Sequence, residues 1–91
     1  MDRWYITPDI VEVKALDNYN LYLKFETGEE KIYDMKEWIE EYEFYKKLKN
    51  KEYFKNVKTR GCTIEWTNGE DVAPEHLYHD SIPINEFKKR N

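Results

Sequence analysis

The chain has 91 residues, of which 40% are hydrophobic, 37% charged and 16% aromatic, and this ring content indicates one folded domain rather than a disordered chain. Its net charge of −4 at pH 7 argues against nucleic-acid binding by the chain alone, because backbone phosphates require a basic surface. There is no apolar run of membrane-spanning length, no apolar N-terminal signal region and only one cysteine, Cys62, so the sequence favours a cytoplasmic protein without membrane segments or an internal disulfide.

Alternation of apolar and polar residues predicts strands in the first part of the chain, at residues 10–16, 21–26 and 30–35. The residues expected to face the core are Val11, Val13 and Ala15 in the first strand and Leu21, Leu23 and Phe25 in the second. Turn-forming residues separate the three strands at short intervals. We therefore expect a three-stranded antiparallel meander over residues 10–35.

The third strand leaves its orientation open, since either Ile32 or the pair Tyr33 and Met35 can face the core. A helix is expected to follow directly. Asp34 precedes Glu37 by three residues, which is the spacing of a capping box at a helix start.

Residues 35–57 contain no glycine or proline and carry apolar residues at helical spacing. The apolar stripe drifts along this segment, so we expect two or three short helices rather than one bent helix. The second of these covers about residues 43–49 and places Phe44 and Leu48 on one face, four residues apart. Asn50 is expected to end it and to cap the next helical turn.

The C-terminal part predicts a β-hairpin that leads into a helical turn. Residues 62–66 form the first strand, and Asn68-Gly69 is a signal for a two-residue type I′ turn, since both central residues of that turn need positive φ. Residues 70–73 form the returning half of the hairpin, and Pro74 suits the first position of a helix. Among the core residues, Leu23, Phe25, Ile64 and Trp66 are expected to be largely buried.

These segments together describe a small single α+β domain over residues 1–91, with a core of about residues 8–80 and a polar tail at residues 81–91. The Gly turn, the strand ending in Asp, the W-x-N-G-x-D stretch and the Pro-led turn ending in Leu-Tyr resemble the bacterial domain-of-unknown-function family 2442. The positions that carry this resemblance are Gly28, Asp34, Trp66, Asn68, Gly69, Asp71, Pro74, Leu77 and Tyr78. The resemblance implies a small α+β domain without an assigned activity. Genes of the family often neighbour another small uncharacterised gene, which suggests toxin–antitoxin-like or otherwise co-operating pairs.

The stretch from Ile64 to Asp80 is the best candidate for a site, because it gathers acids, two histidines and a tryptophan. His76 and His79 are spaced to share a helical face, but zinc requires three or four converging ligands and no further ligand is evident. In a two-residue hairpin Asp71 lies opposite Trp66, where its carboxylate would accept the indole N–H or cap backbone amides near Pro74. We therefore interpret this stretch as a structural joint between hairpin and helix.

For function, we expect a non-enzymatic protein-interaction module, one half of a two-gene pair or a homo-oligomer, that uses no metal or cofactor. The aromatic residues are too many to be central in so small a core, and exposed Tyr and Trp side chains are favoured at interfaces. Scattered surface rings without function are an equally open interpretation. The candidate binding residues are those of the family motif, namely Trp66, Asn68, Gly69, Asp71, Pro74, Leu77 and Tyr78. The alternative is a small-ligand or metal-assisted activity around Trp66, Asp71, His76 and His79.

Overall fold

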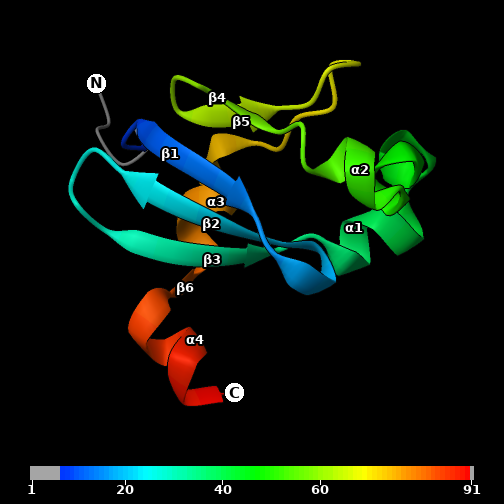
Figure 1. Ribbon diagram of the computed structural model, residues 1–91. Helices are drawn as coiled ribbons and strands as arrows, with labels where there is room; N and C mark the ends of the chain where they lie inside the picture. Colours follow the sequence, from blue (N-terminus) through cyan, green and yellow to red (C-terminus); the bar gives the residue numbers. More distant parts are fainter. Residues whose placement is uncertain (1–6, 91) are drawn as a thin grey trace.

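The protein is an α+β domain in which a four-stranded antiparallel sheet packs against short helices and a separate two-stranded hairpin (Figure 1). The computed structural model describes residues 7–90, so Trp4 and Tyr5, two of the surplus aromatic residues, lie outside the described part. The elements in chain order are β1 (Ile10–Ala15), the turn η2 (Asp17–Tyr19), β2 (Asn20–Phe25), β3 (Glu30–Asp34), α1 (Lys36–Glu41), the 3₁₀ helix η3 (Glu43–Lys49), α2 (Lys51–Phe54), β4 (Lys58–Arg60), β5 (Thr63–Glu65), α3 (Pro74–His79), β6 (Ile82–Pro83) and α4 (Ile84–Arg90).

The N-terminal meander is confirmed, because β1, β2 and β3 pair antiparallel in sequence order. On β2 the inward residues Leu21, Leu23 and Phe25 are all buried, whereas the residues between them are half-buried. This alternation is what a strand with one face on the core produces. The β1–β2 turn is closed by Asn18 and Tyr19, which both have positive φ, at 60° and 59°.

The first strand departs from the predicted alternation at Val11. The register of β1 against β2 shifts between Ile10 and Glu12, so Val11 is the extra residue of a β-bulge. Its side chain is 56% exposed, and Ile10 is buried in the core in its place. A bulge reverses the inward and outward alternation locally, and period two alone does not reveal it.

The third strand buries residues on both of its faces. Tyr33, and Met35 just after the strand, belong to the main core, while Ile32 is buried on the opposite face of the sheet. There Ile32 pairs with Ile82 of β6. The segment expected to be a polar tail therefore supplies a fourth strand and a helix, α4, which lies on the β6 side of the sheet in Figure 1.

The helical region is broken into three short pieces, as predicted, but the middle one has 3₁₀ geometry. Residues three apart share a face in a 3₁₀ helix, so Tyr45 falls in line with the buried Leu48. Phe44, predicted to share that face, is 59% exposed instead. Asn50 caps α2 as predicted, since its Oδ1 accepts hydrogen bonds from the backbone N–H groups of Glu52 and Tyr53.

The capping box predicted for α1 is wrong in detail. Met35 occupies the N-cap position and provides no side-chain cap. Asp34 Oδ1 accepts instead from the backbone N–H of Lys36 at 2.8 Å, and its other oxygen lies 3.1 Å from Lys36 Nζ. The helix therefore begins one residue later than the predicted capping box requires, and Asp34 bonds the turn just before it.

The core lies between the inner face of the sheet, the helices α1 to α3 and the strand β5. The four residues predicted to be largely buried, Leu23, Phe25, Ile64 and Trp66, are all at most 2% exposed. Within residues 7–90, no helix is long and apolar enough to cross a membrane.

Candidate functional site

The W-x-N-G-x-D stretch forms a tight loop whose register differs from the predicted one. Trp66 N–H donates to Glu70 O at 3.0 Å, and Gly69 N–H donates to Trp66 O at 2.9 Å. Within this loop only Gly69 has a positive φ, at 96°. A three-residue loop that ends in a left-handed glycine replaces the two-residue type I′ turn, and it brings Asp71 opposite Glu65 rather than Trp66. The predicted hairpin is also shorter than expected. The longer run of strand pairing lies instead between β4 and β5, which are connected through Gly61 and Cys62.

Trp66 is a core residue whose polar atom is already satisfied. Its indole Nε1 donates to the backbone oxygen of Phe54 at 2.8 Å, and the ring centroids of the two residues lie 5.7 Å apart. The predicted bond from Trp66 to the Asp71 carboxylate is therefore wrong. Asp71 is exposed, and within residues 7–90 its carboxylate accepts no hydrogen bond, while its backbone oxygen accepts from Tyr45 Oη at 2.7 Å.

The buried acid of this stretch is Glu70, which the sequence interpretation missed. Its side chain is only 5% exposed and accepts a hydrogen bond from Tyr53 Oη at 2.7 Å. The same hydroxyl oxygen accepts from the backbone N–H of Asn68 at 2.7 Å. Burial, and then the bond to Glu70, raises the pKa of Tyr53, so this hydroxyl remains a donor at neutral pH. A three-residue loop length would have identified Glu70, because it makes Glu70 the partner of Trp66.

Helix α3 is fixed to the sheet through the last residues of the motif. Pro74 occupies its first turn, and Leu77 is fully buried in the core. The hydroxyl of Tyr78 donates to Glu29 Oε1 at 2.7 Å. Lys31 Nζ lies 4.2 Å from the centroid of the Tyr78 ring and donates to the Tyr78 backbone oxygen at 2.7 Å. We call residues 64–80 the C-terminal joint, because the buried and hydrogen-bonded residues of this stretch connect the hairpin loop to helix α3 and to the sheet.

The two histidines do not converge with Asp71. His76 Nδ1 lies 2.7 Å from Asp80 Oδ2, one helical turn away, and the exposed His79 contacts the ring of Tyr78. Within residues 7–90, no group of three or more His, Cys, Asp or Glu side chains is placed to hold a metal ion. Trp66 is buried in the core, so the four residues of the alternative site are not brought together.

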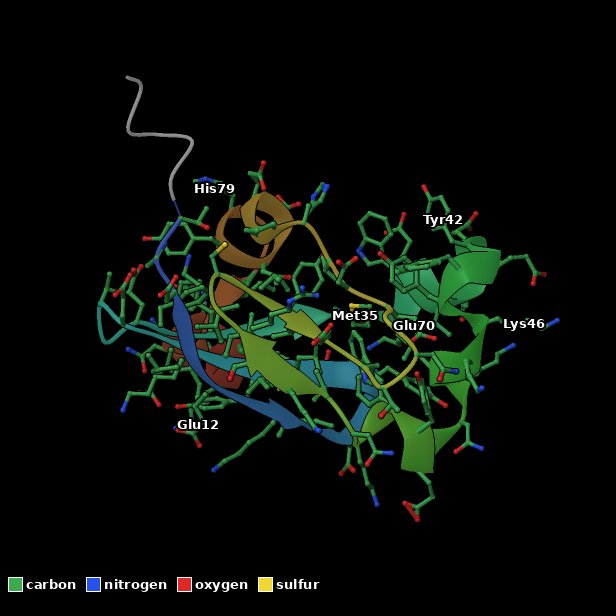
Figure 2. The ribbon with its side chains drawn as sticks, turned by 90° about the horizontal axis from the view of Figure 1, so that it is seen from above. Glu12, Met35, Tyr42, Lys46, Glu70 and His79 are labelled. Carbon is green, nitrogen blue, oxygen red and sulfur yellow. The ribbon has the colours of Figure 1, made fainter. Side chains whose placement is uncertain are left out.

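A second region gathers aromatic rings from α1, η3 and α3. The ring of Trp38 lies 5.2 Å from that of Tyr42, 5.7 Å from Tyr45 and 5.4 Å from His76, centroid to centroid. The ring of Phe44 continues this chain, 4.9 Å from Tyr45. We call these five residues the aromatic patch. Figure 2 shows Tyr42 on the outside of the helical region, whereas Met35 and Glu70 lie toward the middle of the molecule.

Next to the aromatic patch lies a hollow of about 300 Å³ between the end of β3, α1 and α3. Its aromatic walls are Tyr33, Trp38, Tyr42 and His76, and the carboxylates that line it are Asp34, Glu37 and Asp80. Trp38 Nε1 donates to Tyr33 Oη at 2.8 Å, which fixes the indole in the wall. Burial raises the pKa of Tyr33 to about 12, so its hydroxyl is neutral at physiological pH. None of these residues except Asp34 belongs to the sequence motif, because the hollow forms only when α1 and α3 pack together.

The chain matches the family described as "Protein of unknown function (DUF2442)" over residues 10–83, and it belongs to that family. This confirms the resemblance found from the motif residues, and the matched range runs from β1 to the end of β6. No curated protein matches the chain, and no solved structure does.

Proposed function

We propose that this protein is a non-enzymatic interaction module that binds another protein through its aromatic patch. The observation that carries the proposal is the exposure of two neighbouring rings on one surface. Tyr42 is 53% and Phe44 59% exposed, although both contact rings that are held against the core. Exposed aromatic clusters of this kind supply the anchors of protein interfaces, because they carry a large area with few rotatable bonds.

The ionisable groups give further support to binding rather than catalysis. General acid–base catalysis is most efficient when the pKa of the catalytic group lies near the working pH. Here the pKa values of Tyr22, Tyr33, Tyr45, Tyr53 and Tyr78 are raised above 10.0, and that of Glu29 is lowered below 4.5. Each of these shifts makes its group less able to exchange a proton near neutral pH.

We assign the partner to the product of a neighbouring gene, which the family resemblance suggests, and place the pair in the cytoplasm. The test is to co-express the two proteins, purify the complex and measure its stoichiometry by light scattering and its Kd by calorimetry. Phe44→Ser should weaken binding about tenfold or more, as truncation of an interface anchor does. Val11→Ser is the matched control, because Val11 is 56% exposed but lies in the bulge of β1.

Two outcomes would overturn the proposal. One is that the two proteins elute separately at micromolar concentration. The other is that Phe44→Ser and Val11→Ser bind the partner as tightly as the wild type does. If the chain instead forms a dimer that Phe44→Ser dissociates, the patch binds a second copy, and the assignment to a different protein is wrong.

A further inference from the structure

We propose that the hollow between α1 and α3 receives a cationic side chain, a lysine or an arginine, from a basic segment of the partner protein. This inference rests on the proposed function and names the chemistry of the partner at one point of its contact surface. It follows from the walls of the hollow, the charges on its rim and its size.

The walls of the hollow contain aromatic rings that contact one another. The Trp38 and Tyr42 rings lie 5.2 Å apart at an angle of 32°, and the His76 ring meets Trp38 edge to face, at 66°. The indole is held by its hydrogen bond to Tyr33 Oη. The faces of Trp and Tyr rings attract cations, and a preformed wall costs a ligand little reorganisation.

The rim of the hollow carries one carboxylate that has no partner in the described part of the chain. Asp34 is paired with Lys36, and Asp80 is paired with the ring of His76. Glu37 forms neither a hydrogen bond nor an ion pair with any of residues 7–90, although it lines the hollow. A cation on the aromatic wall would therefore find an acceptor in Glu37, and the net charge of −4 would favour its approach.

The size and polarity of the hollow exclude other classes of occupant. Its volume of about 300 Å³ is at the lower limit of ligand pockets, which suits one side chain rather than a large cofactor. A phosphate or carboxylate would be repelled by the three acids on the rim. A purely apolar side chain would reduce the hydration of the Glu37 carboxylate without giving it a partner, which is costly.

The experiment is a ¹⁵N NMR titration of the full chain at low salt with the capped peptide acetyl-Gly-Arg-Gly-amide. The reporter is the indole N–H of Trp38, assigned by its loss in Trp38→Phe. We expect a saturable shift with a Kd in the millimolar range, about what a single side chain contributes. The peptide with citrulline in place of arginine, which has nearly the same shape but no charge, should cause no saturable shift.

Two variants on the same helix test the role of the rim. Glu37→Gln should weaken binding of the arginine peptide about fivefold, because it removes the free carboxylate. Glu40→Gln is the matched control, since Glu40 is also exposed on α1 but does not line the hollow, and it should bind like the wild type. Equal shifts with the arginine and citrulline peptides, or no shift with either, would overturn the inference.

The same variants separate this inference from the proposed function. If Phe44→Ser disrupts the complex with the partner while Glu37→Gln leaves its Kd unchanged, the patch is an interface and the cation site is wrong. If the arginine peptide titrates as expected but Phe44→Ser leaves the complex intact, the hollow binds a cationic side chain, and the proposed function with Phe44 as an interface anchor is wrong.

Discussion

The C-terminal joint and the aromatic patch share His76, yet their other aromatic and polar groups differ in burial and in hydrogen bonding. In the joint, the Trp66 indole and the Glu70 carboxylate are buried and hydrogen-bonded within the fold. In the patch, the Tyr42 and Phe44 rings are exposed, and Glu37 beside them has no partner among the described residues. The buried groups of the motif region are thus hydrogen-bonded within the fold, whereas the aromatic patch keeps exposed rings and a neighbouring carboxylate available for a partner.

The largest expected contrast between the two regions is in the cost of removing an apolar side chain. Leu77→Ala in the joint should lower the free energy of unfolding by about 2–4 kcal/mol, because it leaves a cavity in a fully buried site. Phe44→Ala removes a larger side chain but should change stability by less than about 0.5 kcal/mol, since its ring is mostly in water. Urea unfolding of both variants measures this difference. Equal midpoints for the two variants would mean that the patch is part of the core.

A finer contrast lies within the joint, between the adjacent acids Glu70 and Asp71. Glu70→Ala should cost about 1–3 kcal/mol, because the half-buried hydroxyl of Tyr53 loses its acceptor, and Glu70→Gln should recover part of this by keeping an oxygen there. Asp71→Ala should stay within about 0.5 kcal/mol of the wild type, as exposed substitutions do. Thermal melts at pH 7 test this order of stability among the three variants. If Asp71→Ala is the more destabilised variant, the observed register of the loop is wrong.

This pair of acids also shows where inference from the sequence ends. Strand alternation, the Asn50 cap and the helix start at Pro74 depend on neighbours in the chain, and each was predictable. Asn-Gly is compatible with hairpin loops of two lengths, and a difference of one residue exchanges the inward and outward acids. The motif alone therefore pointed to Asp71 rather than Glu70.

The hollow could not be predicted from the sequence for a different reason. Its aromatic wall comes from β3, from α1 and the residue after it, and from α3, and no local pattern predicts that these elements meet. The exposure of Phe44 has a similar origin, because the sequence is compatible with an α-helix at residues 43–49 and only the 3₁₀ geometry turns that ring outward. Packing between segments, rather than periodicity, creates the candidate contact surface.

The smallest expected effect concerns the bond between Tyr78 and Glu29, which holds the joint to the sheet. The bond from Tyr78, with a smaller one from Thr27, lowers the pKa of Glu29, and the bond to Glu29 raises the pKa of Tyr78. A lowered carboxylate pKa stabilises the fold above its ordinary value of 4.5, and this contribution is lost as the pH falls through the lowered pKa. A raised phenol pKa stabilises the fold below 10.0, and that contribution is lost as the pH rises.

Tyr78→Phe should therefore cost at most about 1 kcal/mol at pH 7, since the partners are near the surface, and this cost should shrink in both acid and alkali. Urea unfolding of wild type and variant at pH 3, 7 and 11 measures the three differences. Tyr33→Phe, in the wall of the hollow, is the control for the acid limb, because its hydroxyl accepts from Trp38 rather than donating to a carboxylate that titrates there. If the cost of Tyr78→Phe is the same at pH 3 as at pH 7, the Glu29 carboxylate is not its acceptor, and other contacts, such as those of Leu77, Lys31 and the Tyr78 ring with Phe25, hold α3 to the sheet.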